Sequence, residues 1–81
     1  MSRRCRFAIA HFAEAASALS VRRALVAQGA DAAGLRLERA ETAEAGSCRL
    51  EVPLPALLEK RLLDILLASA ALRVDVHDAI L

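Results

Sequence analysis

Four short segments of this chain alternate between apolar and polar residues, and this alternation limits the fold more than any other feature of the sequence. The segments are residues 4–11, 35–39, 48–54 and 73–80. A period of two places successive side chains on opposite sides of an extended chain, which is typical of strands buried on one side. The sequence therefore predicts four half-buried strands.

Two further segments follow the spacing of a helix. Over residues 17–28, Ala18, Val21 and Leu25 share one face, and Gly29 follows as a C-terminal stop. Over residues 55–71, Pro55 is tolerated because the first helical position needs no amide donor. The core face predicted for this second helix consists of Leu58, Leu62, Ile65 and Ser69.

The predicted order is strand, helix, strand, strand, helix, strand, with the polar stretch 40–47 as a hairpin connection. This is the ferredoxin-like βαββαβ arrangement, an α+β two-layer sandwich in which two helices cover one face of a four-stranded antiparallel sheet. A chain of 81 residues holds one such core. We therefore expect residues 1–81 to form a single domain.

The alternation also predicts which side chains face the helices. One set of alternate strand positions is mostly charged, and we expect it on the open side of the sheet. This set consists of Arg4, Arg6, Arg36, Glu38, Arg49, Glu51, Arg73, Asp75 and His77. The other set of alternate positions is apolar, and we expect it beneath the helices. This set consists of Cys5, Phe7, Ile9, Leu35, Leu37, Cys48, Leu50, Val52, Val74 and Val76. On this interpretation the open face is a charged surface, either a solvated ladder of ion pairs or a docking face for a protein.

Composition excludes several classes of function. A net charge of +1 and 2% aromatic residues offer neither the basic surface nor the stacking rings of a nucleic-acid-binding protein. The chain lacks an apolar run long enough to span a membrane. We expect a soluble, cytoplasmic protein that binds no nucleic acid and no membrane.

No pattern for catalysis or for a cofactor is present in the sequence. The parity places His11 toward the core and His77 on the open face, so they are not expected to share a metal. The serines lack a nucleophile motif, and the three glycines are not grouped to bind phosphate. We expect a protein without catalytic residues, metal or cofactor, with a small enzyme using His11 or His77 as the less favoured alternative.

Cys5 and Cys48 stand at the starts of two strands that this topology makes antiparallel neighbours. They are then at opposite ends of the sheet, on the order of 20 Å apart at ~3.3 Å per residue. A disulfide needs Cα atoms within about 7 Å. We therefore predict two free thiols.

Three leucines of the second helix, Leu57, Leu63 and Leu67, lie outside its predicted core face. Exposed apolar patches on small domains usually mark an interface. We expect a homodimer, or docking on a larger subunit.

The stretch Val21–Leu37, VRRALVAQGADAAGLRL, resembles the first helix and second strand of ACT domains, which are ferredoxin-like regulatory modules that often bind amino acids. Val21, Leu25 and Gly29 fill the first positions of the family pattern, and Leu35 and Leu37 fill its apolar alternation. Asp31 and Ala32 replace the family's Asn-Ile. Length and element order are most similar to those of the short regulatory subunit of acetolactate synthase.

The resemblance implies a ligand-site turn at Glu14, Ala15 and Ala16, together with Gly29 and Asp31. Ligand-binding members carry Asp/Asn-x-Pro-Gly at that first turn, where this chain reads Ala-Glu-Ala-Ala. The resemblance thus implies a non-catalytic regulatory domain that acts through contact with another protein, such as a larger catalytic subunit, with an amino acid as a further candidate ligand. The alternative is a structural ferredoxin-like subunit without a ligand.

Overall fold

The computed structural model describes residues 4–39 and 48–80. The strands are β1 (Arg4–Phe12), β2 (Arg36–Arg39), β3 (Cys48–Pro53) and β4 (Arg73–Ile80). The helices are α1 (Ala15–Ala27) and α2 (Glu59–Leu67), with a short 3₁₀ helix, η1 (Ala32–Gly34), before β2. The predicted hairpin connection at 40–47 lies outside the described residues.

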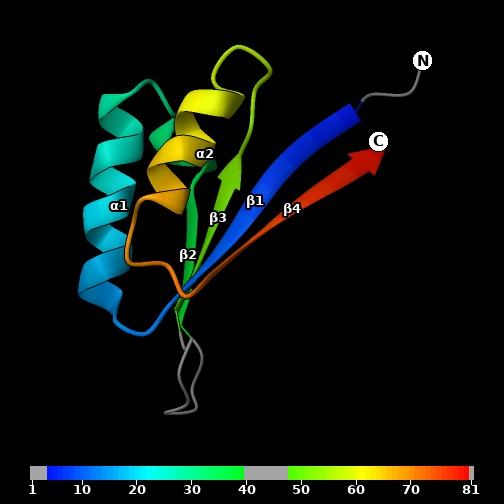
Figure 1. Ribbon diagram of the computed structural model, residues 1–81. Coiled ribbons are helices and arrows are strands. Elements are labelled where there is room, and N and C mark those ends of the chain that lie inside the picture. The colour runs from blue at the N-terminus through cyan, green and yellow to red at the C-terminus, as the bar shows by residue number, and fades with distance from the viewer. Residues whose placement is uncertain (1–3, 40–47, 81) are drawn as a thin grey trace.

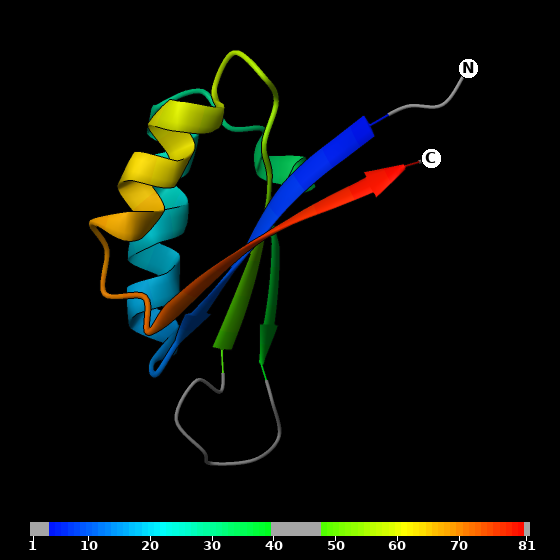
Figure 2. The ribbon, with the colours of Figure 1, turned by 45° about the vertical axis from the view of Figure 1, so that its right-hand side comes forward.

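The four strands form one antiparallel sheet in the order β2-β3-β1-β4. Both helices lie on the same face of this sheet, and no helix or strand of the described residues covers the other face (Figure 1). The predicted α+β, ferredoxin-like sandwich is therefore confirmed. Toward the start of β1 and the end of β4, these two strands lean away from the helices as a two-stranded ribbon (Figures 1 and 2).

Helix α1 ends as its sequence predicts. Gly29 has a φ of 109°, a left-handed conformation that costs glycine little. The amide of Gly29 donates to the carbonyl of Val26, and the amide of Ala30 donates to the carbonyl of Leu25, both at 3.0 Å. These two bonds form a Schellman motif that satisfies the last carbonyls of the helix. The inward face of α1 is Ala18, Val21 and Leu25, as predicted.

Helix α2 is shorter than predicted at both ends. Pro55 begins a turn, closed by a 2.9 Å bond from the Leu58 amide to the Pro55 carbonyl, and the helix starts at Glu59. Ser69 lies beyond the helix end, where its hydroxyl donates to the Leu66 carbonyl and accepts from the Ala71 amide. Such local side-chain bonds compete with continuation of a helix. The buried face of α2 is consequently Leu62 and Leu66, with Leu58 and Ile65 at its margin.

The core lies between the helices and the sheet and is mostly aliphatic. Its largest fully buried side chains come from both helices, from β3 and from the end of β1. They are Phe12, Leu25, Leu50, Leu62, Leu66 and Val52. At about 25 cal/mol per Å² of apolar surface, burial of such side chains is the main favourable contribution to folding.

The predicted orientation of β1 is wrong. Ala8, Ala10 and Phe12 are fully buried beneath the helices, whereas Phe7 and Ile9 lie on the open face and Cys5 is exposed. The register explains the orientation, because Ala8 pairs with Val52 and Ala10 with Leu50, and directly paired residues point to the same side. Small alanines on the central strand leave room for Leu25, Leu62 and Leu66 above them.

This orientation also moves Arg6 to the side of the sheet on which the helices lie. Its guanidinium reaches Glu59 at the start of α2 at 3.1 Å and Asp78 of β4 at 3.3 Å. Through these two ion pairs, Arg6 connects the two-stranded part of β1 and β4 to the first turn of α2. The parity predicted for β2 and β3 is confirmed, since Leu35, Cys48, Leu50 and Val52 are buried.

The two cysteines are free and lie at opposite ends of the sheet, as predicted. Cys5 pairs with Ala79 at one end of β1, and Cys48 pairs with Phe12 at the other. Their side chains also belong to opposite faces, one exposed and one buried.

Candidate functional site

The open face of the sheet has an apolar centre that the sequence analysis did not predict. Phe7 and Ile9 of the central strand β1 are half-buried there, and Pro53 of β3 pairs with Phe7 on the same side. No described element packs over this face (Figure 2). We call Phe7, Ile9, Pro53 and His77 the apolar centre of the open face.

His77 joins this centre through its ring. Phe7 and His77 are paired across β1 and β4, and their rings stack with centroids 5.3 Å apart and planes inclined by 21°. The stack positions the imidazole on the sheet surface while leaving the residue exposed. An aromatic pair of this kind is preorganised for contact because few rotamers remain to be fixed.

Charged side chains flank the centre on both sides. On the β4 side, Asp75 accepts from Arg73 Nε at 2.9 Å and lies 3.6 Å from His11 Nε2. On the β2 side, Arg49 Nη2 lies 3.7 Å from Glu38 Oε2. An apolar centre inside a polar rim is the usual anatomy of a protein–protein interface.

The two histidines lie on one face, and the prediction that they point to opposite sides is wrong. His11 pairs with Arg73 and His77 with Phe7, so four positions of β1 separate them, about 13 Å at ~3.3 Å per residue. Each has its own neighbour, a carboxylate for His11 and a phenyl ring for His77. Among the described residues, no group of three histidine, cysteine or acidic side chains could hold a metal ion.

The turn implied by the family resemblance is divided between the two ends of α1. Glu14 is the residue before the helix, Ala15 and Ala16 form its first turn, and Gly29 and Asp31 follow its last. A helix of 13 residues places these groups about 20 Å apart at ~1.5 Å per residue. Within one copy of the chain they are not brought together into one site.

Gly29 and Asp31 have local structural roles in this turn. The Asp31 carboxylate accepts from the Ala33 amide at 3.0 Å and so caps the 3₁₀ helix η1. Gly29 supplies the left-handed conformation that ends α1 and lies beside Leu58. Both residues are thereby explained by the fold.

The three leucines predicted as an interface do not form a single patch. Leu57 is 99% exposed on the turn before α2, and Leu67 is 70% exposed at the end of that helix. Leu63 is half-buried and packs against the core. The first and last of these leucines are separated by the length of the helix.

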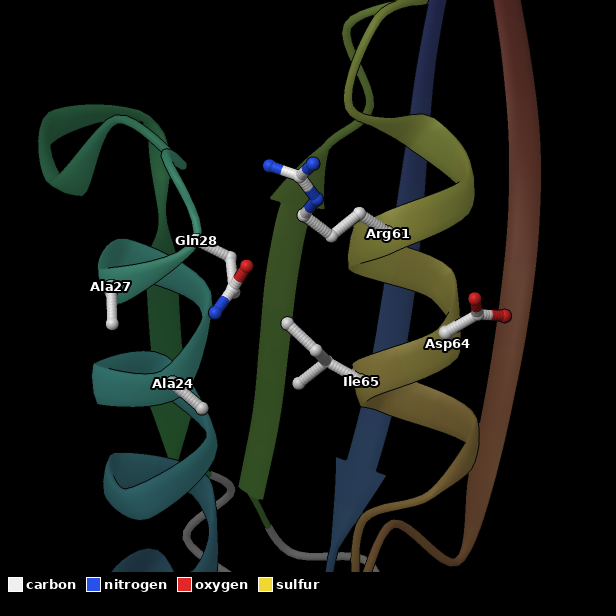
Figure 3. Close-up of a pocket in the computed structure, with 6 residues that line it drawn as sticks. All are labelled: Ala24, Ala27, Gln28, Arg61, Asp64 and Ile65. Atoms are coloured by element: carbon white, nitrogen blue, oxygen red, sulfur yellow. The ribbon is translucent and has the colours of Figure 1, made fainter.

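A shallow groove of about 500 Å³ runs between the outer sides of the two helices (Figure 3). Ala24, Ala27 and Gln28 line it from α1, and Arg61, Asp64 and Ile65 line it from α2. In the close-up, Ile65 extends toward α1, whereas the Asp64 carboxylate points away from it (Figure 3). Gln28 from α1 and Arg61 from α2 also extend into the gap between the two helices (Figure 3).

Comparison with protein-family models, with curated proteins and with solved structures finds no match to this chain. In the part of the chain that the structure describes, no helix is long and apolar enough to cross a membrane. The fold is an α+β sandwich in which residues 4–39 and 48–80 leave one face of the sheet uncovered.

Proposed function

We propose that this chain is a non-catalytic regulatory domain that acts by binding another protein across the open face of its sheet. The observation that carries the proposal is the apolar centre made by Phe7 and Ile9 on a face without a covering layer in the described chain. Exposed apolar groups rimmed by polar residues commonly mark protein interaction sites.

The ACT-like pattern of Val21–Leu37 supports the regulatory part of this proposal, with a larger catalytic subunit as the partner. Val21 and Leu25 form the inward face of α1, and Gly29 ends it.

Binding of a free amino acid is less favoured by the geometry of the first turn. Glu14 brings a carboxylate to the start of α1, where the carboxylate of an amino acid would have to approach the helix amides. The second acidic residue of the implied site, Asp31, already accepts a hydrogen bond from Ala33. We therefore assign regulation to protein contact.

Catalysis by either histidine is also less favoured. An acid–base residue must lie within hydrogen-bond reach of a substrate held in place. His11 and His77 lie on an open sheet, and neither lines one of the three described cavities.

The proposal is tested by capture with the immobilised chain from an extract of its source cells. The variant Ile9→Lys introduces a charge at the centre of the face, and the pairing of Ile9 with Glu51 and Asp75 gives the new ammonium two acidic neighbours. Leu67→Lys is the matched control, an equally apolar residue exposed on the helix side.

We expect the unmodified chain and Leu67→Lys to retain the same protein at fixed stoichiometry, and Ile9→Lys to lose it. Removal of an interface anchor typically costs about 2 kcal/mol or more, roughly 30-fold in affinity. A partner held equally by all three chains would contradict the assignment of this face.

A further inference from the structure

The two edges of the sheet differ in how well they are protected against pairing with another strand. The edge strand β2 is four residues long, and apart from Leu37 all its residues are charged. The opposite edge strand β4 has eight residues and contains no proline, glycine or lysine. Short length, charge and proline are the usual means by which proteins protect an edge. Within the described chain, β4 is the longer and less densely charged edge, with Arg73, Asp75 and Asp78 as its charged residues.

The outer half of β4 is also free of the helix layer. The strand leans away from α1 and α2 beyond its middle (Figures 1 and 2). Val76 is 40% exposed although it pairs with the fully buried Ala8 and points to the same side as the helices. The exposed valine marks the place where apolar surface remains to be covered.

We propose that two copies of this chain pair through β4, antiparallel, about a two-fold axis at Val76. The result is a continuous eight-stranded sheet with all four helices on one side. This pairing uses the backbone edge of β4, where Asp75 and His77 belong to the open face. It needs only a second copy of the chain and not the partner proposed above.

The two-fold axis restricts the possible registers. In an antiparallel pair, residues directly opposite point to the same side, so the axis must pass through a residue rather than between two residues. An axis at Asp75 would place two carboxylates opposite each other, and an axis at His77 would place two imidazoles opposite each other. An axis at Val74 would pair only the first residues of the strand.

The register centred on Val76 pairs a carboxylate with an imidazole and brings two apolar side chains together. Asp75 then lies opposite His77 of the second copy, and this pair occurs twice by symmetry. The two exposed Val76 side chains meet on the side of the sheet that carries the helices. An imidazole N–H can donate to a carboxylate across the two strands, whereas like charges directly opposite each other destabilise a sheet. The strands overlap over Arg73–Ala79.

Disulfide trapping tests the register directly. In the Cys5→Ser background, Val76→Cys places two thiols opposite each other, where antiparallel Cα atoms lie about 4.5–5.5 Å apart, within disulfide range. The matched control is Val74→Cys on the same side of the strand. Its thiol would lie opposite Asp78 of the second copy, four residues or about 13 Å from its own equivalent. The Cys5→Ser chain alone, with its buried Cys48, gives the background.

Two variants that each add one negative charge test the same register without a new thiol. His77→Asp sets two carboxylates opposite each other at both symmetric positions. Ala79→Asp adds the same charge two residues along the strand, opposite Arg73 of the second copy. Sedimentation at low salt should show self-association weakened at least about threefold by the first and strengthened by the second.

The proposal predicts a cross-linked dimer for Val76→Cys and none for Val74→Cys. It is overturned if sedimentation shows a monomer up to about 100 µM, or if Val74→Cys cross-links as readily as Val76→Cys. If Val76→Cys does not fold, equal effects of the two aspartate variants overturn it instead. All of these measurements use the purified chain alone, so failure here leaves the partner of the open face unaffected.

Discussion

The imidazole of His77 stacks on the phenyl ring of Phe7 across the two strands that project from the helix layer. This contact joins the central strand to the edge strand on the face that we assign to binding. Replacing His77 with alanine should lower the free energy of unfolding by about 0.5–1 kcal/mol, because an aromatic pair contributes about that much beyond its area. Urea unfolding measures the loss. Lys60→Ala, at an exposed position of α2, serves as control; an unchanged midpoint for His77→Ala would contradict the stack.

The orientation of β1 is tested at Ala10. This residue is fully buried between the sheet and the helices, so Ala10→Leu should destabilise the domain by about 1–3 kcal/mol through overpacking. For a domain of this size each kcal/mol lowers Tm by about 4–8 °C. Ala16→Leu, at an exposed position of α1, should be nearly neutral. Equal, small effects of both variants would mean that Ala10 faces solvent.

The end of α1 depends on Gly29. Because its φ of 109° is unfavourable for any residue with a Cβ, Gly29→Ala should cost about 1–2 kcal/mol of stability. The added methyl group would meet Leu58 at an ordinary contact distance of 3.6 Å, so the loss reports backbone strain rather than a clash. The Tm of Gly29→Ala is compared with that of the Gln28→Ala variant. An unchanged Tm for Gly29→Ala would argue against the Schellman motif at the end of α1.

The two thiols should differ in reactivity. Cys5 is exposed and Cys48 is buried, so a thiol reagent should modify the first quickly and the second only on unfolding. Mass spectrometry of partly labelled chain distinguishes the two sites. In denaturant without reductant, we expect two labelled thiols per chain. A lower number would indicate a disulfide.

Branched-chain amino acids should not bind. The Glu14 carboxylate opposes an incoming carboxylate, and Asp31 is engaged by the Ala33 amide. Calorimetry with valine, leucine and isoleucine at millimolar concentration should show no saturable heat. A dissociation constant below about 1 mM, or −4.1 kcal/mol, would restore an amino acid as the regulator.

Much of the fold could be predicted from periodicity because large aliphatic side chains mark one side of an element. Leu50 and Val52 identify the inward side of β3, and Val21 and Leu25 that of α1. The same rule fails for β1, where both parities are apolar and the larger Phe7 and Ile9 lie outside. The orientation of β1 is set by its register with β3 and by the close approach of the helices. Both depend on residues that are distant from β1 in the sequence.

The candidate site could not be predicted for the same reason. The open face owes its apolar centre to the orientation of β1, and the Phe7–His77 contact joins residues near opposite ends of the chain. The run Ala8, Ala10 on a central strand is the available signal, since alanine there permits close helix packing.

The central claim is that a partner protein covers Phe7 and Ile9, and cross-saturation in solution tests it without any substitution. The chain is labelled at its Ile and Leu methyl groups, the captured partner is saturated, and the loss of each methyl signal is recorded. The account predicts strong attenuation at Ile9 and none at Leu67, which lies on the helix side. Attenuation at Leu67 with an unaffected Ile9 would contradict it.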